Sequence, residues 1–181
     1  MQETDRPTAI TLIAAVADDG FLSGENGGIP WHLPRDIRHF RRHAAGKFLL
    51  LGRTTFEEMR GWFTDQIPLV LTRNPAVLSP PGIPVETVAD AVAIVRAAAA
   101  LPLLVCGGAQ TYAAALPSAD TLILTRVHTI LGRGKSFPSL PPEWQETARE
   151  HFPADAENPL PMTILHLKHP SSPHPFPSLP T

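Results

Sequence analysis

The chain has 181 residues, 43% of them apolar, and a formal net charge of −2. These values are typical of one globular domain and give no indication of a nucleic-acid or membrane partner. The apolar runs are too short to span a bilayer, and residues 1–7 lack the character of a signal peptide. The single cysteine, Cys106, excludes an internal disulfide framework and a cysteine-rich metal site. We therefore expect a cytoplasmic protein.

The first part of the chain contains an apolar run, a glycine-rich segment and a helix signal. Residues 10–17 are β-branched and small apolar residues without helical spacing, and residues 20–30 contain four glycines. We predict a buried strand that opens into a loop. A helix is predicted to begin at Pro34, which suits a first turn, and to end before Gly46.

Strands and helices alternate along the rest of the chain. Further strands are predicted at residues 48–52, 68–72, 103–106, 121–127 and 163–167, and further helices after a cap at Thr54 or Thr55, at residues 88–100 and at residues 111–116. This order predicts an α/β fold, in which a mostly parallel sheet is covered by helices on both faces. Residues 169–181 are rich in proline and serine, and we expect a disordered tail after a single domain of residues 1–168.

The segment of residues 27–36 carries the densest functional signal. A glycine loop meets a rigid Pro-Trp turn, and Asp36 follows in the first turn of the predicted helix. The helix continues with one stripe formed by Ile37, Phe40, Arg41 and Ala44. A carboxylate at the edge of a pocket can bind an amidine-like group, two N–H donors on one planar ring, through two parallel hydrogen bonds. The alternative is an acid that interacts only with the helix dipole.

A series of motifs in the expected order resembles dihydrofolate reductase. Residues 30–40 match the family pattern Pro-Trp-x-Leu-Pro-x-Asp-Leu-x-x-Phe, with isoleucine in place of the second leucine. Residues 51–56, 105–112, 124–126 and 136–138 resemble Met-Gly-Arg-x-Thr-Trp/Phe, Ile-Gly-Gly-x-x-x-Tyr, Leu-Thr-x and Phe-Pro. The resemblance covers about residues 9–168. It implies a central, mostly parallel twisted sheet with an antiparallel C-terminal edge strand.

The resemblance implies a dihydropterin as the substrate. Asp36, supported by Thr125, would bind the 2-amino group and a ring nitrogen of the pterin, and Trp31 would position a water beside the ring. The other implied substrate contacts are Ile13, Ala15, Ile29, Ile37, Phe40, Met59, Phe63, Gln66, Cys106 and Tyr112.

The implied cofactor is NADPH, bound at two strand-to-helix turns whose free N–H groups favour phosphate. Arg53 and Arg73 are candidates to bind the adenosine 2′-phosphate. The other implied cofactor contacts are Ala15, Leu22, Gly52, Thr54, Thr55, Thr72, Gly107, Gly108, Ala109, Gln110 and Thr111. The implied reaction is hydride transfer to C6 of the pterin with protonation at N5, and it needs no metal.

Three other residues invite a chemical interpretation. His39 and His43 have the spacing of metal ligands on a helix, but no third ligand is evident, and we interpret them as a solvated face. Cys106 ends a buried strand without an adjacent base, and we interpret it as a core thiol rather than a nucleophile.

The sequence departs from the family where the substrate's tail is expected to bind. In dihydrofolate reductases an arginine just before a strand forks onto the α-carboxylate of folate's glutamate, and Gln66 stands at that position. Glutamine cannot supply a charged fork, and Asp65 beside it would repel a carboxylate. The acid of the family's Gly-Asp-x-x-Phe-Pro turn is also missing, because Arg133 follows Gly132.

The missing arginine favours dihydromethanopterin as the substrate, because its arm lacks the glutamyl carboxylate at that place. Dihydromethanopterin reductases of methylotrophic bacteria are similar to dihydrofolate reductase. The alternative is an ordinary dihydrofolate reductase. A reductase of riboflavin synthesis lacks the segment that contains Trp31 and Asp36, and a binding protein without turnover is the non-enzymatic alternative. The small-molecule substrate is the only partner we expect; a homo-oligomer is neither indicated nor excluded.

Overall fold

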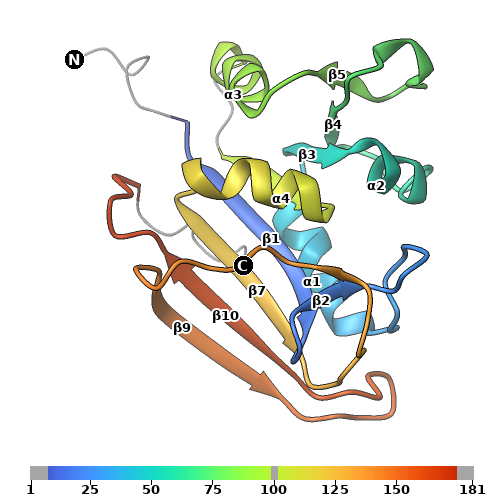
Figure 1. Ribbon diagram of the computed structural model, residues 1–181, viewed down its shortest axis with the longest axis vertical. Helices are drawn as coiled ribbons and strands as arrows, with labels where there is room; N and C mark the ends of the chain where they lie inside the picture. Colours follow the sequence, from blue (N-terminus) through green and yellow to red (C-terminus); the bar gives the residue numbers. More distant parts are fainter. Residues whose placement is uncertain (1–7, 99–101, 175–181) are drawn as a thin grey trace.

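The computed structural model describes residues 8–98 and 102–174. Its centre is an eight-stranded sheet with the order β5-β4-β3-β6-β1-β7-β10-β9 (Figure 1). The strands are β1 (Ile10–Ala17), β3 (Phe48–Gly52), β4 (Ile67–Leu71), β5 (Ile83–Val85), β6 (Leu103–Gly107), β7 (Thr121–Val127), β9 (Gln145–Phe152) and β10 (Met162–Lys168). Neighbours from β5 to β7 are parallel, whereas β10 is antiparallel to β7 and to β9. The predicted sheet with an antiparallel C-terminal edge is confirmed.

Helices cover both faces of the sheet. They are α1 (Pro34–Ala44), α2 (Arg53–Glu58), α3 (Val88–Ala97) and α4 (Ala109–Ala115), with short 3-10 turns at Pro75–Val77 and Leu116–Ser118. Alternate strand residues enter different cores: Leu50 packs in the core that contains α3 and α4, and Leu49 packs in the core that contains α1 and α2. This alternation follows from the two-residue period of a strand and explains why these strands are apolar throughout.

The element bounds differ from the prediction in a few places. Strand β4 begins one residue earlier than expected, and α3 ends at Ala97, while residues 99–101 of the predicted helix lie outside the described residues. The predicted cap of α2 by Thr54 or Thr55 is wrong, because β3 runs directly into the helix and Gly52 occupies the cap position without a side-chain hydrogen bond. The side chains of Thr54 and Thr55 are therefore free to line the cleft that α2 borders.

Helix α1 buries its two histidines. Ile37 is 39% exposed, whereas His39 and His43 are each 5% exposed. The interpretation of the two histidines as a solvated face is wrong; their ring centroids lie 4.6 Å apart. Of the predicted stripe, Ile37, Phe40 and Arg41 line the cleft described below, whereas Ala44 is buried in the core.

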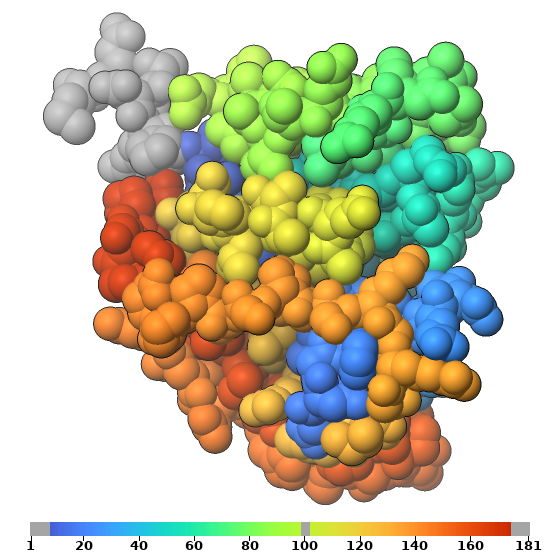
Figure 2. Space-filling view, viewed as in Figure 1, coloured from blue at the N-terminus to red at the C-terminus, as the bar shows by residue number. Residues whose placement is uncertain are grey.

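A second, two-stranded sheet joins two loops that are far apart in the sequence. Strand β2 (Phe21–Ser23) pairs with β8 (Lys135–Ser136), and the N–H of Phe137 donates to the carbonyl of Gly20 at 3.0 Å. Figure 2 shows the corresponding blue and orange segments side by side on one face of the molecule. Residues predicted as a glycine loop are thus partly ordered by this pairing.

The C-terminal segment continues beyond β10. The N–H of His169 donates to the carbonyl of Asp120 at 2.9 Å, and the ring of His169 contacts Trp144. Residues 175–181 of the predicted tail lie outside the described residues. Within residues 8–98 and 102–174, no helix has the length and apolar character needed to cross a membrane.

Candidate active site

A cleft of about 1730 Å³ opens at the carboxyl ends of the parallel strands β1, β3, β4 and β6. This is the usual place for a ligand in an open α/β sheet, because loops and helix starts converge there. Helix α1 and α2, the loop after β2 and the start of α4 form its walls. Residues of both predicted subsites, one for the substrate and one for the cofactor, line this cleft.

Asp36 lies in the first turn of α1 and lines the cleft. The hydroxyl of Thr125, which is buried in β7, donates to Oδ1 of Asp36 at 2.6 Å. Burial raises the pKa of Asp36, and the hydrogen bond from Thr125 opposes that rise. The predicted pair of Asp36 and Thr125 is therefore brought together, although 89 residues separate the two in the sequence.

Helix α1 has no cap from its own sequence, because Leu33 occupies the cap position. The cap comes instead from the loop between β9 and β10: Oδ1 of Asn158 accepts the N–H of Arg35 at 2.9 Å. Asn158 is 1% exposed and donates its own N–H and amide to Oδ1 of Asp155.

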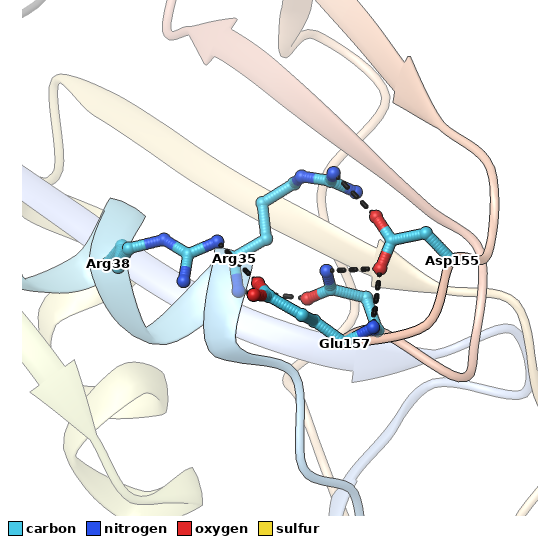
Figure 3. Close-up of polar contacts among 5 residues, drawn as sticks. Arg35, Arg38, Asp155 and Glu157 are labelled. Carbon is cyan, nitrogen blue, oxygen red and sulfur yellow. Dashed lines mark hydrogen bonds and ion pairs between the residues drawn. The ribbon is translucent and has the colours of Figure 1, made fainter.

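Two ion pairs surround this cap (Figure 3). The guanidinium of Arg35 donates to Asp155 at 2.7 Å, and Arg38 lies 3.4 Å from Glu157. The loop thereby fixes the turn that carries Asp36. Sequence reasoning missed Asn158; the pattern Asp-x-x-Asn at residues 155–158 is a local turn signal, but nothing in it indicates a partner in α1.

The ends of β1 and β6 form the inner wall of the cleft. The hydroxyl of Tyr112 is buried and donates to the carbonyl of Ile13 at 2.6 Å. Cys106 lines the cleft with its thiol 3.6 Å from the carbonyl of Leu104, and burial raises the pKa of that thiol. A neutral thiol agrees with the interpretation of Cys106 as unreactive.

Most of the predicted residues of the substrate site line the cleft; Thr125, Phe63 and Trp31 do not. Those on its surface are Ile13, Ala15, Ile29, Asp36, Ile37, Phe40, Met59, Gln66, Cys106 and Tyr112. Phe63 instead stacks on Phe56 at 5.5 Å between ring centroids, as part of the core. Trp31 packs against the same core, and its indole N–H is buried without a hydrogen-bond partner among the described residues.

All of the predicted cofactor contacts line the other half of the cleft: Ala15, Leu22, Gly52, Arg53, Thr54, Thr55, Thr72, Arg73, Gly107, Gly108, Ala109, Gln110 and Thr111. The ends of β3 and β6 meet there at very short range. A Cβ on Gly52 would lie 3.0 Å from Oγ1 of Thr111, and one on Gly108 would lie 3.2 Å from Oγ1 of Thr55. Only glycine leaves this floor open to a ligand that approaches the backbone.

The two predicted phosphate-binding arginines differ in their surroundings. Arg53 forms an ion pair with Glu57 at 2.7 Å, one helical turn further along α2. Arg73 lies exposed at the rim of the cleft, and no ion pair of Arg73 is found within the described residues. Arg73 is therefore the more available cation for an anionic group.

Gln66 and Asp65 are held within their own loop. The amide of Gln66 donates to Oδ1 of Asp65, and its Oε1 accepts the N–H of Thr64 at 3.0 Å. The other oxygen of Asp65 accepts the N–H of Gly46 at 2.8 Å. These bonds fix the side chain of Gln66 and use one of its two N–H donors and one of its two acceptor sites.

The fold and the cleft define an α/β protein that binds its ligands across the carboxyl ends of a parallel sheet. The sequence model of the family described as dihydrofolate reductase matches residues 9–169. The chain belongs to the dihydrofolate reductase family and is an oxidoreductase of that family.

Individual relatives agree with this assignment. Dihydrofolate reductase type 3 of Salmonella typhimurium is 39% identical over 150 residues, 82% of this chain and 91% of that protein. Dihydrofolate reductase of Bacillus subtilis is 29% identical over 157 residues, 86% of this chain and 92% of the relative. Dihydrofolate reductase from Enterococcus faecalis, solved in a complex with NADP(H) and RAB-propyl, has a similar fold, with a TM-score of 0.80, 24% identity and coverage of 90% and 97% of the two chains.

Proposed function

We propose that the protein is an NADPH-dependent dihydrofolate reductase, which converts dihydrofolate into tetrahydrofolate. The observation that carries the proposal is the buried pair of Asp36 and Thr125 at a cleft whose other half has a glycine floor. The relatives compared above are named dihydrofolate reductases, at 29% to 39% identity. The expectation of dihydromethanopterin is replaced for this reason. A cytoplasmic location remains part of the proposal.

Asp36 binds and orients the pterin. Its carboxylate accepts two N–H donors of the ring, while Thr125 holds one carboxylate oxygen in place. Because burial disfavours the charged form, the carboxylate of Asp36 gains from any N–H donor brought to it. Ile13 and Cys106 also line the cleft, and their carbonyls would accept donors from the other edge of the ring.

The other half of the cleft fits NADPH. The open floor at Gly52 and Gly108 admits a diphosphate close to the backbone, and Arg73 offers a cation for a 2′-phosphate. When bound, the cofactor supplies the hydride for C6 of the pterin. The protein's part is to place the two rings in contact and to exclude bulk water, with Ile29 at the outer edge. The buried N–H of Trp31 has no hydrogen-bond partner among residues 8–98 and 102–174 and is suited to hold the water that carries the proton to N5.

The test is oxidation of NADPH by purified protein in the presence of dihydrofolate, with dihydromethanopterin run alongside. We expect turnover with dihydrofolate at a KM in the micromolar range of ordinary enzymes. Asp36→Asn should abolish most of this activity, and Glu143→Gln, an exposed acid away from the cleft, should retain it. Turnover with dihydromethanopterin but not with dihydrofolate would refute this proposal and support dihydromethanopterin as the substrate.

A further inference from the structure

Among the described residues, four acidic side chains line the cleft, and one of them has no partner. Asp36, Glu58 and Asp65 each accept a hydrogen bond from another residue of the protein. The carboxylate of Glu86 is exposed and takes part in no hydrogen bond or ion pair within residues 8–98 and 102–174. A carboxylate that the fold itself does not use is available to a ligand of the cleft.

Glu86 directly follows β5, the edge strand of the sheet, and lies beside the end of β4 (Figure 1). The two strands are parallel, with Leu71 paired to Val85, and the N–H of Thr72 donates to the carbonyl of Val85 at 3.0 Å. Thr72 and Glu86 therefore occupy neighbouring positions on strands about 4.8 Å apart, and Arg73 comes next in the chain. A cation and an acid thus stand at the same corner of the cleft, and no ion pair joins them within the described residues.

The order of the strands indicates which part of the cofactor reaches this corner. The glycine floor lies at the ends of β3 and β6, and the sheet continues from there to β1 on one side and to β4 and β5 on the other. A dinucleotide whose nicotinamide lies beside the pterin near β1, and whose diphosphate crosses the glycine floor, therefore brings its adenosine to the ends of β4 and β5.

The start of α3, close to the same corner, does not offer a phosphate site. Its cap residue Thr87 accepts the N–H of Asp90 at 3.1 Å, and the carboxylate of Asp90 accepts the N–H of Thr87 at 2.9 Å. This capping box uses donors that a phosphate would need, and it places a second acid four residues after Glu86. Arg73 is therefore opposed by the negative charge of its surroundings when it attracts an anion.

We propose that Glu86 determines the cofactor specificity of the protein by accepting the 2′-hydroxyl of NADH and repelling the 2′-phosphate of NADPH, against the attraction of Arg73 for that phosphate. The inference rests on the proposed function, because it assumes that a dinucleotide places its adenosine at this corner. In dinucleotide sites of parallel sheets, an acid accepts the ribose 2′-hydroxyl of NADH, whereas an arginine binds the 2′-phosphate of NADPH. This cleft presents both residues, so NADPH is preferred less strongly than Arg73 alone would require.

The test measures the dissociation constants of NADPH and NADH by fluorescence titration of the purified protein at low ionic strength, and compares their ratio, Kd for NADH over Kd for NADPH. Glu86→Gln should raise this ratio about three- to fivefold, mainly through tighter binding of NADPH. Glu86→Lys should raise it at least about tenfold, because a second cation replaces the acid. Arg73→Gln should lower it at least about fivefold. Glu143→Gln makes the same change at an exposed acid outside the cleft and should leave the ratio within about 1.5-fold of wild type.

The outcomes separate the inference from the proposed function. Wild-type protein that binds neither cofactor and does not reduce dihydrofolate would refute both. Wild-type protein that reduces dihydrofolate with NADPH, while Glu86→Gln and Glu86→Lys leave the ratio unchanged, would refute the inference alone. Equal tightening of both cofactors would also refute it, because Glu86 would then act on the diphosphate that the two cofactors share. A rise in the ratio that becomes smaller at high salt supports the inference.

Discussion

Burial raises the pKa of Asp36, so the carboxylate form that a pterin requires is less favourable in the folded protein than in the unfolded chain. For an acid whose folded pKa is raised, stability is greatest at low pH and part of it is lost as the pH rises through the folded pKa. The residue that binds the substrate therefore weakens the fold at neutral pH. Activity and stability make opposite demands on this residue.

Asp36→Asn is expected to lower the activity and to raise the stability near neutral pH. Loss of two charge-assisted hydrogen bonds, at about 1.5–3 kcal/mol each, predicts a fall in kcat/KM of at least about 100-fold. The melting temperature without ligands should rise near neutral pH, and the difference from wild type should shrink on acidification toward the ordinary pKa of 3.8. Steady-state kinetics and thermal unfolding at several pH values test this. A variant that is less stable than wild type at neutral pH would contradict it.

At the scale of elements, a loop remote in sequence fixes the start of α1. Asn158→Ala removes the cap of Arg35 and leaves the partly buried N–H of Arg35 without its acceptor. We expect a loss of about 1–2 kcal/mol in the free energy of unfolding, together with a higher KM for dihydrofolate because the first turn of α1 carries Asp36.

Glu157→Gln is the matched control for Asn158→Ala. It removes an exposed ion pair with Arg38 in the same loop, at 3.4 Å, and such pairs contribute little. Urea unfolding and KM measurements on both variants should therefore separate the cap from the surface charge. Equal effects of the two substitutions would argue against the role of Asn158 as a cap.

Pairing of β2 with β8 predicts an unequal effect of two glycine substitutions in one loop. Both Gly132 and Gly134 have positive φ, at 76° and 144°, so alanine is strained at either. A Cβ on Gly134 would also collide with the carbonyl oxygen of Ser23, whereas one on Gly132 would meet nothing within 4 Å. Gly134→Ala should therefore separate the strands, release the loop that carries Ile29 and lower kcat/KM several-fold more than Gly132→Ala. Similar kinetics for the two variants would refute this.

The elements that were predicted well are those whose own residues form a recognisable pattern. Residues 10–17, 48–52 and 121–127 became strands with the predicted bounds, because they are mostly buried and rich in apolar residues. Strand β9 was missed because seven of its eight residues are exposed; its partner β10 holds it, rather than its own burial. Strands β2 and β8 depend in the same way on a partner.

The buried face of α1 shows where residue type misleads. Ile37 and Phe40 were implied substrate contacts, and both line the cleft. His39 and His43 were interpreted as a solvated face because no third metal ligand was evident, yet each is only 5% exposed. The polar character of this segment gave no indication that the histidine face packs in the interior.

At the scale of the whole molecule, this buried histidine pair predicts sensitivity to acid. Burial and neighbouring positive groups lower the pKa of His39 to about 3 and that of His43 to about 4. The groups that act on the pair are His166, Arg42 and Lys47. Below the ordinary histidine pKa of 6.5, the two side chains bind protons in the unfolded chain but not in the folded chain. The stability therefore falls as the pH falls from 6.5 toward 4.

The expected loss is on the order of 3 kcal/mol between pH 6.5 and pH 4.5. Urea unfolding across this range, by wild type and by a His39→Gln/His43→Gln double variant, measures it. The variant should show a flatter dependence on pH. Asp155, whose pKa is lowered to about 2, changes charge only below this range and does not confound the comparison. Equal slopes for the two proteins would contradict this prediction, because they would mean that the pair binds the same number of protons in the folded and the unfolded chain.

Much of the candidate site could also be predicted from sequence, because its residues lie in short motifs at the ends of strands. The glycine turn at Gly107 and Gly108 and the acid at Asp36 occupy the predicted places. Asn158 was not assigned a role, since its importance comes from a contact across the fold: it supplies a cap to Arg35, 123 residues away. Such contacts leave no local pattern.

The most direct test of the account is NADPH oxidation by the purified protein with dihydrofolate as the substrate. We predict turnover at micromolar dihydrofolate that Asp36→Asn reduces at least about 100-fold. An absence of turnover with dihydrofolate, or equal turnover by wild type and Asp36→Asn, would contradict the assignment of this cleft as a dihydrofolate reductase site.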